Sequence, residues 1–234
     1  MINRNELSKK AILKCPDDYK LEFPNSKCSV TISVGQEPHE RDKFKSTLAV
    51  VNDSFNHCTI MVCDSLQRHT LKIGMQTTDD EIHKHANQLG ESWIGRNINA
   101  IKKLDIEYNI IRWDYWLSHP EYKKSRKIID DLALHNQGFV NVIEETAMEF
   151  LKRNLHKITN IESEQNVLRY SREYLKEECA VMLLWMKDNY QFEIYPSKRN
   201  TAMDFVYKHV ISKINPNLVR AVAIKFKSIT PVMV

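Results

Sequence analysis

Glycine is scarce in this sequence, and the glycine-rich motifs that bind phosphates are missing from it. The 234 residues include five glycines. Neither GxGxxG nor GxxxxGK[ST] follows any strand that the sequence predicts. In both motifs, glycine lets the backbone approach a phosphate group closely. The absence of these motifs argues against a dinucleotide site and against a P-loop.

Long apolar segments are missing as well. The first residues, MINRNELSKKAILK, carry charges throughout. No apolar run approaches the roughly 18 residues that a membrane-spanning helix requires. We therefore expect a soluble protein that is not exported and does not bind a membrane.

The cysteine and histidine patterns lack the pairs that a disulfide framework or a zinc site would need. The five cysteines are odd in number and form no CxxC pair, and three of them lie in apolar stretches. His83 and His85 are two residues apart on a predicted helix, so they point to different faces. We expect free thiols, a cytoplasmic location and no bound metal.

Short apolar, β-rich segments alternate with long segments of helical period. This pattern is typical of an α/β fold in which helices flank a mostly parallel sheet. No composition shift divides the chain, so we expect one domain over residues 1–234, with residues 1–26 as an N-terminal extension packed on it. The five predicted strands are 28–33, 58–63, 106–113, 191–195 and 220–226; the clearest predicted helices are 41–55, 78–104, 120–136, 140–154, 164–188 and 201–214.

The first predicted strand, CSVTIS, ends on a serine that is followed one residue later by a glycine. Ligands of doubly wound sheets bind outside the carboxyl ends of the strands, where the strand order reverses. Ser33 ends the first strand and Asp64 follows the second, so both should lie near that crevice. Gly35 would allow a sharp turn or a close approach to a ligand. The alternative is that Ser33 only ends a strand or caps a turn.

A tyrosine and a glutamate form a second candidate pair on the predicted helix 164–188. Tyr174 and Glu178 are four residues apart, so they share one helix face just before the helix becomes apolar all round. A phenol and a carboxylate at the edge of a core can bind an ammonium group, and partial burial can raise the carboxylate pKa enough to make it a base. The alternative is an ordinary surface pair.

Tyr195 ends the fourth predicted strand. Pro196 follows it and ends the strand, because proline has no N–H to donate to a neighbouring strand. Tyr195 would then open into the same crevice as Ser33. The alternative is a half-buried tyrosine without a catalytic role.

Together these segments resemble the cyclodipeptide synthases, which join the aminoacyl groups of two aminoacyl-tRNAs into a cyclic dipeptide. The family's signatures match VTISVG around Ser33, YLKEE at Tyr174 to Glu178, and IYP at Tyr195 and Pro196, the last as in the family's Pro branch. HPEY at 119–122 resembles a further family segment. The similarity in order and spacing runs from about residue 27 to residue 226.

The resemblance implies a Rossmann-like, five-stranded sheet similar to the catalytic domain of class I tyrosyl- and tryptophanyl-tRNA synthetases. It also implies no cofactor, because the amino acid arrives activated as an ester. In the substrate pocket it implies Gly35, Gln36, Tyr122, Ser29 and Thr31. Ser29 and Thr31 depart from the family's usual residues where the pocket for the first aminoacyl group is built, which concerns side-chain preference rather than the reaction.

The catalytic roles are likewise implied by the resemblance. Ser33 would be the nucleophile and carry first the aminoacyl group and then the dipeptidyl group. Tyr174 and Glu178 would hold the α-ammonium, with Glu178 assisting proton transfer, and Tyr195 would relay a proton in later steps. Backbone N–H groups from Val34 to Gln36 are candidate oxyanion donors.

Two tRNA substrates require a basic surface, and the chain is mildly basic, with a formal net charge of +4. On the helix 78–104, Arg96 and Lys103 share a face and Lys102 flanks them, so we expect these three residues to contact tRNA phosphates. We expect a monomer. Two alternatives remain open from the residues alone: a nucleotide-processing enzyme that uses Asp64 and Ser33, and a non-catalytic tRNA-binding protein with a synthetase-like fold.

Overall fold

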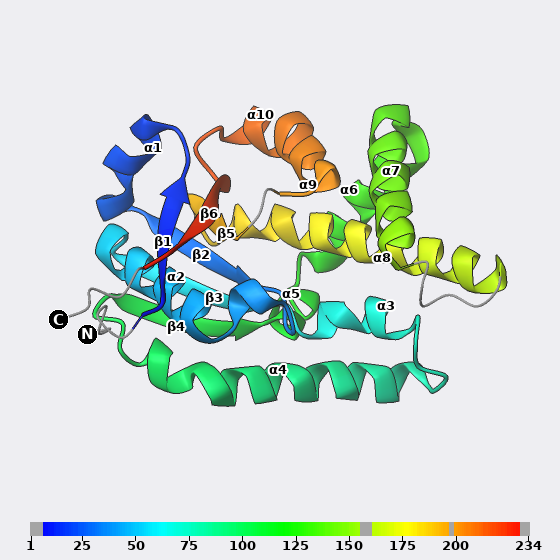
Figure 1. Ribbon diagram of the computed structural model, residues 1–234. Coiled ribbons are helices and arrows are strands. Elements are labelled where there is room, and N and C mark those ends of the chain that lie inside the picture. Colours follow the sequence, from blue (N-terminus) through cyan, green and yellow to red (C-terminus); the bar gives the residue numbers. More distant parts are fainter. Residues whose placement is uncertain (1–6, 155–160, 197–198, 230–234) are drawn as a thin grey trace.

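A computed structural model describes residues 7–154, 161–196 and 199–229, and it shows a twisted sheet with helices on both faces (Figure 1). Within these residues the sheet has six strands in the order β1-β6-β5-β2-β3-β4. The strands from β6 to β4 are parallel to their neighbours, whereas β1 pairs antiparallel with β6. The predicted Rossmann-like α/β fold is confirmed. None of the helices described is both long enough and apolar enough to cross a membrane.

The predicted strands are all present, within two residues at each end. The strands are β1 (Lys9–Lys14), β2 (Lys27–Ile32), β3 (His57–Val62), β4 (Glu107–Arg112), β5 (Phe192–Tyr195) and β6 (Arg220–Ser228). The helices are α1 (Asp17–Glu22), α2 (Arg41–Ser54), α3 (Arg68–Leu71), α4 (Asp79–Ile101), α5 (Trp113–Leu117), α6 (Tyr122–His135), α7 (Gln137–Asn154), α8 (Ile161–Trp185), α9 (Thr201–Val206) and α10 (Ser212–Ile214).

The strand count of five was wrong, because β1 lies inside the segment that the sequence suggested was an extension. Its sequence KKAILK carries three lysines, and only Ala11 and Leu13 face the core. Two buried residues give too short an alternation to identify a strand. Lysines on an edge strand also discourage pairing with other chains, which fits the position of β1 at one edge of the sheet.

The predicted helix 201–214 is not α-helical throughout. α9 passes into a π-helical turn, Tyr207–Ile211, before α10. Val206 and Ile211, five residues apart, are both fully buried. A π turn brings residues at this spacing onto one side, so the change of helix type lets both side chains reach the core.

Each face of the sheet has its own core. Val30 and Ile32 of β2 pack with Phe44 of α2 and Trp93 of α4. On the other face, Met61 of β3 packs with the apolar end of α8 and with α5, α7 and α9. Successive residues of a strand point to opposite faces, so Ser29, Thr31 and then Ser33 fall on the α8 side of β2.

Helix α4 packs very closely on the end of β3. Its start is fixed by the expected capping box, in which the Thr78 hydroxyl accepts the Glu81 N–H and the Glu81 carboxylate accepts the Thr78 N–H. Farther along, a Cβ atom at Gly90 would overlap the buried Asp64 side chain. Glycine is therefore required where the helix crosses the carboxyl end of β3.

Candidate active site

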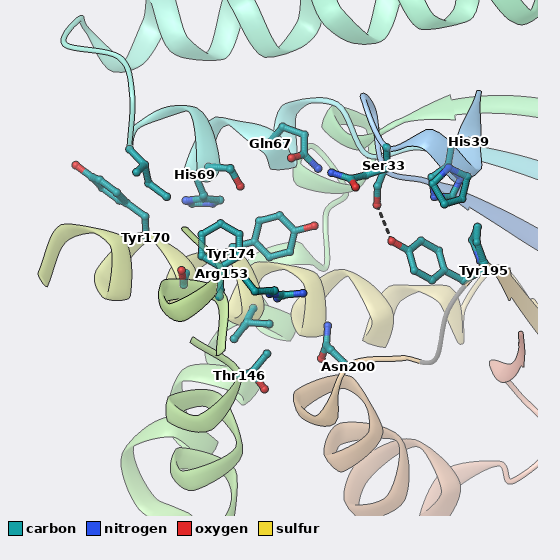
Figure 2. A pocket seen from close by; sticks show the side chains of 18 residues that line it. Ser33, His39, Gln67, His69, Thr146, Arg153, Tyr170, Tyr174, Tyr195 and Asn200 are labelled. Carbon is teal, nitrogen blue, oxygen red and sulfur yellow. Dashed lines mark hydrogen bonds between the residues drawn. The ribbon is translucent and has the colours of Figure 1, made fainter. Parts of the chain in front are cut away.

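The two strands at which the sheet order reverses bring Ser33 and Tyr195 together. From β2 the chain adds β3 and β4 on one side, then crosses over to add β5 and β6 on the other. Ser33 directly follows β2 and Tyr195 is the last residue of β5. The Ser33 Oγ and the Tyr195 hydroxyl are 3.0 Å apart, at hydrogen-bonding distance (Figure 2). The pair therefore lies at the topological switch point, where parallel α/β sheets bind their ligands.

A tight turn presents Ser33 at this point. The Gln36 N–H donates to the Ser33 carbonyl oxygen at 3.2 Å, and Gly35 has a φ of 83°. These values fit a type II turn, which needs a positive φ at its third residue and therefore favours glycine. The turn occupies the Gln36 N–H, so this group is not free to act as an oxyanion donor. Val34 and Gly35 remain from the expected range.

A cavity of about 650 Å³ opens from the Ser33–Tyr195 pair along α8. In Figure 2, Ser33, His39 and Tyr195 lie at one end, Tyr170 lies at the other, and Tyr174 and Arg153 lie between them. Its lining includes the predicted residues Ser33, Gln36, Tyr174, Tyr195 and Pro196, and adds Pro38, His39, Gln67, His69, Thr70, Ile73, Thr146, Phe150, Arg153, Tyr170, Ser171, Leu175 and Asn200. Three of the four predicted catalytic residues, Ser33, Tyr174 and Tyr195, thus line one cavity. The fourth, Glu178, is next to it, bonded to the lining residue Asn200.

Glu178 is held in a poorly solvated position below Tyr174 on α8. Burial raises the pKa of Glu178 to about 8, and the nearby Glu193 carboxylate acts in the same direction. Two neighbours oppose the shift: Asn200, whose Nδ2 donates to the Glu178 carboxylate at 2.7 Å, and the Arg199 guanidinium. A carboxyl group that titrates near neutrality can give and take protons at physiological pH.

The other groups around Ser33 are neutral. Burial raises the pKa of Tyr195 to about 12, so its hydroxyl keeps its proton and can donate it. Burial lowers the pKa of His39 to about 4, and its ring centroid lies 5.3 Å from that of Tyr195. Burial, with Glu178 nearby, also holds the pKa of the Tyr174 phenol well above its usual value. Ser33 thus has protonated phenols and a neutral imidazole around it.

The pocket residues that the resemblance implied are placed in two ways. Ser29 and Thr31 are buried beneath Ser33, and their hydroxyls have no hydrogen-bond partner within the described residues. Tyr122, at the start of α6, packs against the α8 core outside the cavity lining. Burial, with Glu177 nearby, raises its pKa.

The predicted tRNA-contacting residues lie on α4 or just beyond it, and none of them lines the cavity. Arg96 forms an ion pair with Glu40 at 3.0 Å. Lys102 and Lys103 are exposed just beyond the end of α4, which leads into the start of β4. Because β4 runs parallel to β2 and begins just after these two lysines, they lie near the amino ends of the strands, whereas Ser33 lies at the carboxyl end of β2.

Asp64 does not lie in the cavity, although it follows β3 directly. It is fully buried, and its carboxylate accepts from Arg112 Nε at 2.5 Å and from the N–H groups of Ser65 and Trp113 at 2.8 and 3.2 Å. These bonds tie β3 to the start of α5. The arrangement gives Asp64 a structural role and does not support its use, with Ser33, in a nucleotide site.

Sequence reasoning missed His39 and Asn200 in the cavity lining. His39 lies in a 3-10 turn, Glu37–His39, for which the sequence gave no signal. Asn200 had a signal, because asparagine is a favoured N-cap residue and it directly precedes the predicted helix 201–214. Its side chain does accept the Met203 N–H, at 2.8 Å.

Glu177, the neighbour of Glu178 on α8, is buried and holds the cavity-lining residue His69 in place. Its carboxylate accepts hydrogen bonds from the Arg68 guanidinium and from Trp113 Nε1, the latter at 2.8 Å. It also lies 3.2 Å from His69 Nε2. Burial alone would raise the pKa of Glu177, but the bonds from His69 and Arg68 hold it at about 2. This charged group fixes α3, and with it His69, against α8.

The described residues contain no group of three or more His, Cys, Asp or Glu side chains arranged to hold a metal ion. The five cysteines are free, and four of them are buried.

Comparison with solved structures identifies the class of protein. The chain is similar to the structure of a cyclodipeptide synthase (CDPS) from Fluoribacter dumoffii, with 38% identity and a TM-score of 0.90 over 94% of this chain and 99% of that one. It also matches the fold of a cyclodipeptide synthase from Candidatus Glomeribacter gigasporarum bound to Phe-tRNAPhe, with 16% identity and a TM-score of 0.77 over 94% and 96% of the two chains. No protein-family model and no curated protein sequence matches the chain.

A third structure relates the fold to aminoacyl-tRNA synthetases. It is a Mycobacterium tuberculosis protein, 9% identical with a TM-score of 0.65 over 95% and 94% of the two chains, whose structure demonstrates that cyclodipeptide synthetases are related to type I tRNA synthetases. The protein is therefore an α/β enzyme of synthetase-like fold. The chain belongs to the cyclodipeptide synthase family of aminoacyltransferases.

Proposed function

We propose that this enzyme joins two aminoacyl groups from tRNA into a 2,5-diketopiperazine through covalent intermediates on Ser33. The observation that carries the proposal is the Ser33–Tyr195 hydrogen bond at the switch point of the sheet, at the end of a cavity that also contains Tyr174. This arrangement gives a partly exposed nucleophile, a proton donor and a site for an amino group in one place.

In the first step, Ser33 Oγ attacks the ester carbonyl of the first aminoacyl-tRNA. The ester bond breaks, the tRNA hydroxyl leaves with a proton, and the aminoacyl group remains on Ser33. Tyr195 keeps its own proton at neutral pH, so it can donate a hydrogen bond to Ser33 Oγ and leave the Ser33 proton free for the leaving hydroxyl. The backbone N–H groups of Val34 and Gly35 are the remaining candidate donors to the oxyanion.

Tyr174 and Glu178 would hold the α-amino group of the aminoacyl-enzyme. A bound ammonium favours the ionised form of Glu178, whose pKa of about 8 lies close to that of an amine. Glu178 can therefore accept the proton that the amine must lose before it attacks the second aminoacyl-tRNA. The ester bond of the second aminoacyl-tRNA breaks, its tRNA hydroxyl leaves with a proton, and a dipeptidyl group remains on Ser33. This group cyclises when its free amine attacks the ester carbonyl and releases the Ser33 hydroxyl, with Tyr195 relaying a proton.

The two substrates are aminoacyl-tRNAs, and we infer a cytoplasmic, monomeric enzyme of one domain that needs no metal or cofactor. The tRNA-bound structure from Candidatus Glomeribacter gigasporarum supports such a substrate. Arg96, Lys102 and Lys103 are the proposed phosphate contacts along α4. Gly35, Gln36, Ser29, Thr31 and Tyr122 are the proposed substrate-pocket residues.

Expression in a bacterial host, where all aminoacyl-tRNAs are present, tests this function. Mass spectrometry of the medium should detect cyclic dipeptides from the unaltered protein and none from Ser33→Ala. Purified protein incubated with labelled aminoacyl-tRNA should retain label on Ser33 after denaturation. A folded protein that forms neither product nor adduct would contradict the proposal and leave a tRNA-binding protein without this chemistry.

A further inference from the structure

Asn200 connects Glu178 to the start of α9. It lies in the cavity lining between β5 and α9. Its Oδ1 accepts the Met203 N–H at 2.8 Å, and its Nδ2 donates to Glu178 Oε2 at 2.7 Å. One short side chain therefore makes two bonds, one to a helix end and one to a carboxyl group beside the cavity.

The bond to Met203 determines which way the Asn200 amide faces. A backbone N–H can only donate, so the amide atom facing Met203 must be the oxygen. The amide NH₂ group must then face Glu178. Helix α9 is itself fixed, because Ala202, Met203 and Val206 are buried in the core beneath it. Glu178 thus meets a hydrogen-bond donor in a constant position.

We infer that Asn200 is a positioning residue for Glu178. Its amide group orients the Glu178 carboxyl group toward the α-amino group of the substrate and stabilises the carboxylate form. The inference rests on the proposed role of Glu178. An amide donor of fixed orientation limits the carboxylate to one rotamer and favours its ionised form over its neutral form. Loss of the donor should therefore change both the geometry and the titration of Glu178.

The other groups around Glu178 make this donor important. Glu193 on β5 disfavours the carboxylate, whereas Arg199, in the segment before α9, favours it. Arg199 is itself engaged with Glu193, with its Nε 3.0 Å from Glu193 Oε2. Tyr174 on α8, Tyr195 on β5, Cys63 after β3 and Cys179 on α8 also lie close enough to interact with Glu178, and all four are neutral when protonated. Asn200 is thus the hydrogen-bond donor that favours the Glu178 carboxylate, against the effects of burial and of Glu193.

Two substitutions separate positioning from helix capping. Serine and aspartate are both good N-cap residues, so Asn200→Ser and Asn200→Asp should keep the bond to Met203 and the stability of α9. Asn200→Ser removes the donor to Glu178, and Asn200→Asp replaces it with a second carboxyl group. Thr78→Ala, which removes the N-cap of α4, is the control for the loss of a helix cap alone.

The first readout does not depend on activity. With ¹³C-labelled glutamate, the NMR titration midpoint of Glu178 should rise in Asn200→Ser and rise further in Asn200→Asp, and it should be unchanged in Thr78→Ala. An unchanged midpoint in both Asn200 variants would overturn the inference. The titration tests the inference even if the unaltered protein makes no cyclic dipeptide. Failure to make a cyclic dipeptide would instead contradict the proposed function.

The second readout is the pH profile of cyclic dipeptide formation. If Glu178 acts as the carboxylate, activity rises with pH through the pKa of Glu178. Asn200→Ser should shift this rising limb of the profile to higher pH and lower the rate at pH 7 about tenfold or more. A role in folding alone would lower the melting temperature and leave the limb where it is in the unaltered enzyme. That result would also overturn the inference.

Discussion

The hydroxyl groups of Ser33 and Tyr195 lie 3.0 Å apart, although 162 positions separate the two residues in the chain. Parallel pairing of β2 with β5 places them at neighbouring strand ends, with Thr31 and Tyr195 on the same face of the sheet. The hydrogen bond therefore depends on the crossover that carries the chain from β4 through the helices α5 to α8 and back to the centre of the sheet. This relationship makes Tyr195 the first residue to test beside the nucleophile.

Tyr195→Phe should leave the ring and remove the hydrogen bond to Ser33. We expect cyclic dipeptide formation to fall roughly hundredfold or more, because a positioned proton donor contributes about 10²–10⁴-fold. Labelled aminoacyl-tRNA should still acylate Ser33, since the nucleophile is intact. Single-turnover measurements of adduct formation and of product release would separate the two steps.

Tyr190→Phe is the matched control for Tyr195→Phe. Tyr190 is also buried, and burial raises its pKa to about 12 as well, but it packs near Trp116 outside the cavity lining. We expect its loss to change stability without changing the ratio of adduct to product. Equal effects of the two substitutions on this ratio would remove Tyr195 from the later steps.

The pH dependence of the unaltered enzyme should report Glu178. Its pKa of about 8 is above the ordinary value, so the group is mostly protonated below pH 8 in the folded enzyme. If the carboxylate is the active form, kcat/KM should rise with pH and level off above about pH 8. Glu178→Gln should abolish this limb while the protein remains folded. A rate that is flat between pH 6 and 9 would contradict the assignment of Glu178 as the base.

The same shift has a consequence for stability. Folding raises the pKa of Glu178, so the folded state disfavours its carboxylate form. Glu178 therefore lowers the stability of the protein as pH rises from the ordinary pKa near 4.5 through the folded-state pKa of about 8. Glu177 acts in the opposite sense: its pKa of about 2 means that its stabilising contribution is present above pH 4.5 and is lost as pH falls toward 2. The two adjacent glutamates on α8 thus have opposite effects, and urea unfolding of Glu178→Gln and Glu177→Gln from pH 3 to pH 9 should show this.

The part of the fold and of the candidate site that the sequence predicts depends on how far apart in the chain the interacting residues lie. The apolar, β-rich runs predicted β2, β3, β4, β5 and β6. In β2, β3 and β5 nearly every residue is buried, and this leaves a continuous apolar run as a local signal. The edge strand β1 left almost none. That Ser33 and Tyr195 would share a crevice followed from the rule for strand ends, but the partner strand of β2 depends on the crossover, which no local pattern encodes.

The environment of Glu178 shows the same limit. Its spacing from Tyr174 on one helix face was visible as a local pattern, and the structure places Tyr174 in the cavity lining. Its other neighbours, Glu193, Arg199 and Asn200, come from β5 and the segment before α9, and only the tertiary packing brings them to α8. The pKa of a buried group depends on such neighbours, so the sequence could suggest a shift without its causes.

The close contact between α4 and β3 leads to a stability prediction with an internal control. Gly90→Ala should destabilise the protein by about 1–3 kcal/mol, because its Cβ would overlap Asp64, whose carboxylate is fixed by Arg112. Gly95→Ala, on the same helix with open space around it, should stabilise the protein by about 0.8–1 kcal/mol through helix propensity. Urea unfolding should therefore give effects of opposite sign, and destabilisation by both would contradict this packing.

The proposed tRNA surface on α4 can be tested by its dependence on salt. Lys102 and Lys103 are exposed at the end of α4 remote from Ser33, so their removal should not alter the chemistry of a bound substrate. The double change to alanine should raise KM for aminoacyl-tRNA and leave kcat nearly unchanged. Each phosphate contact that is lost should reduce the slope of log affinity against log salt by about 0.9.

Arg96→Ala and a control pair extend this test. Arg96 is already paired with Glu40, so its removal should have a smaller effect on the salt slope than the loss of a free lysine. Lys225 and Lys227 are exposed on β6, on the other side of the sheet, and changing both to alanine alters the net charge equally. If the β6 pair lowers tRNA affinity as much as the α4 pair, net charge alone explains the effect. If only the α4 pair does so, the substrate tRNA extends along α4 toward the amino ends of the strands, away from the nucleophile at their carboxyl ends.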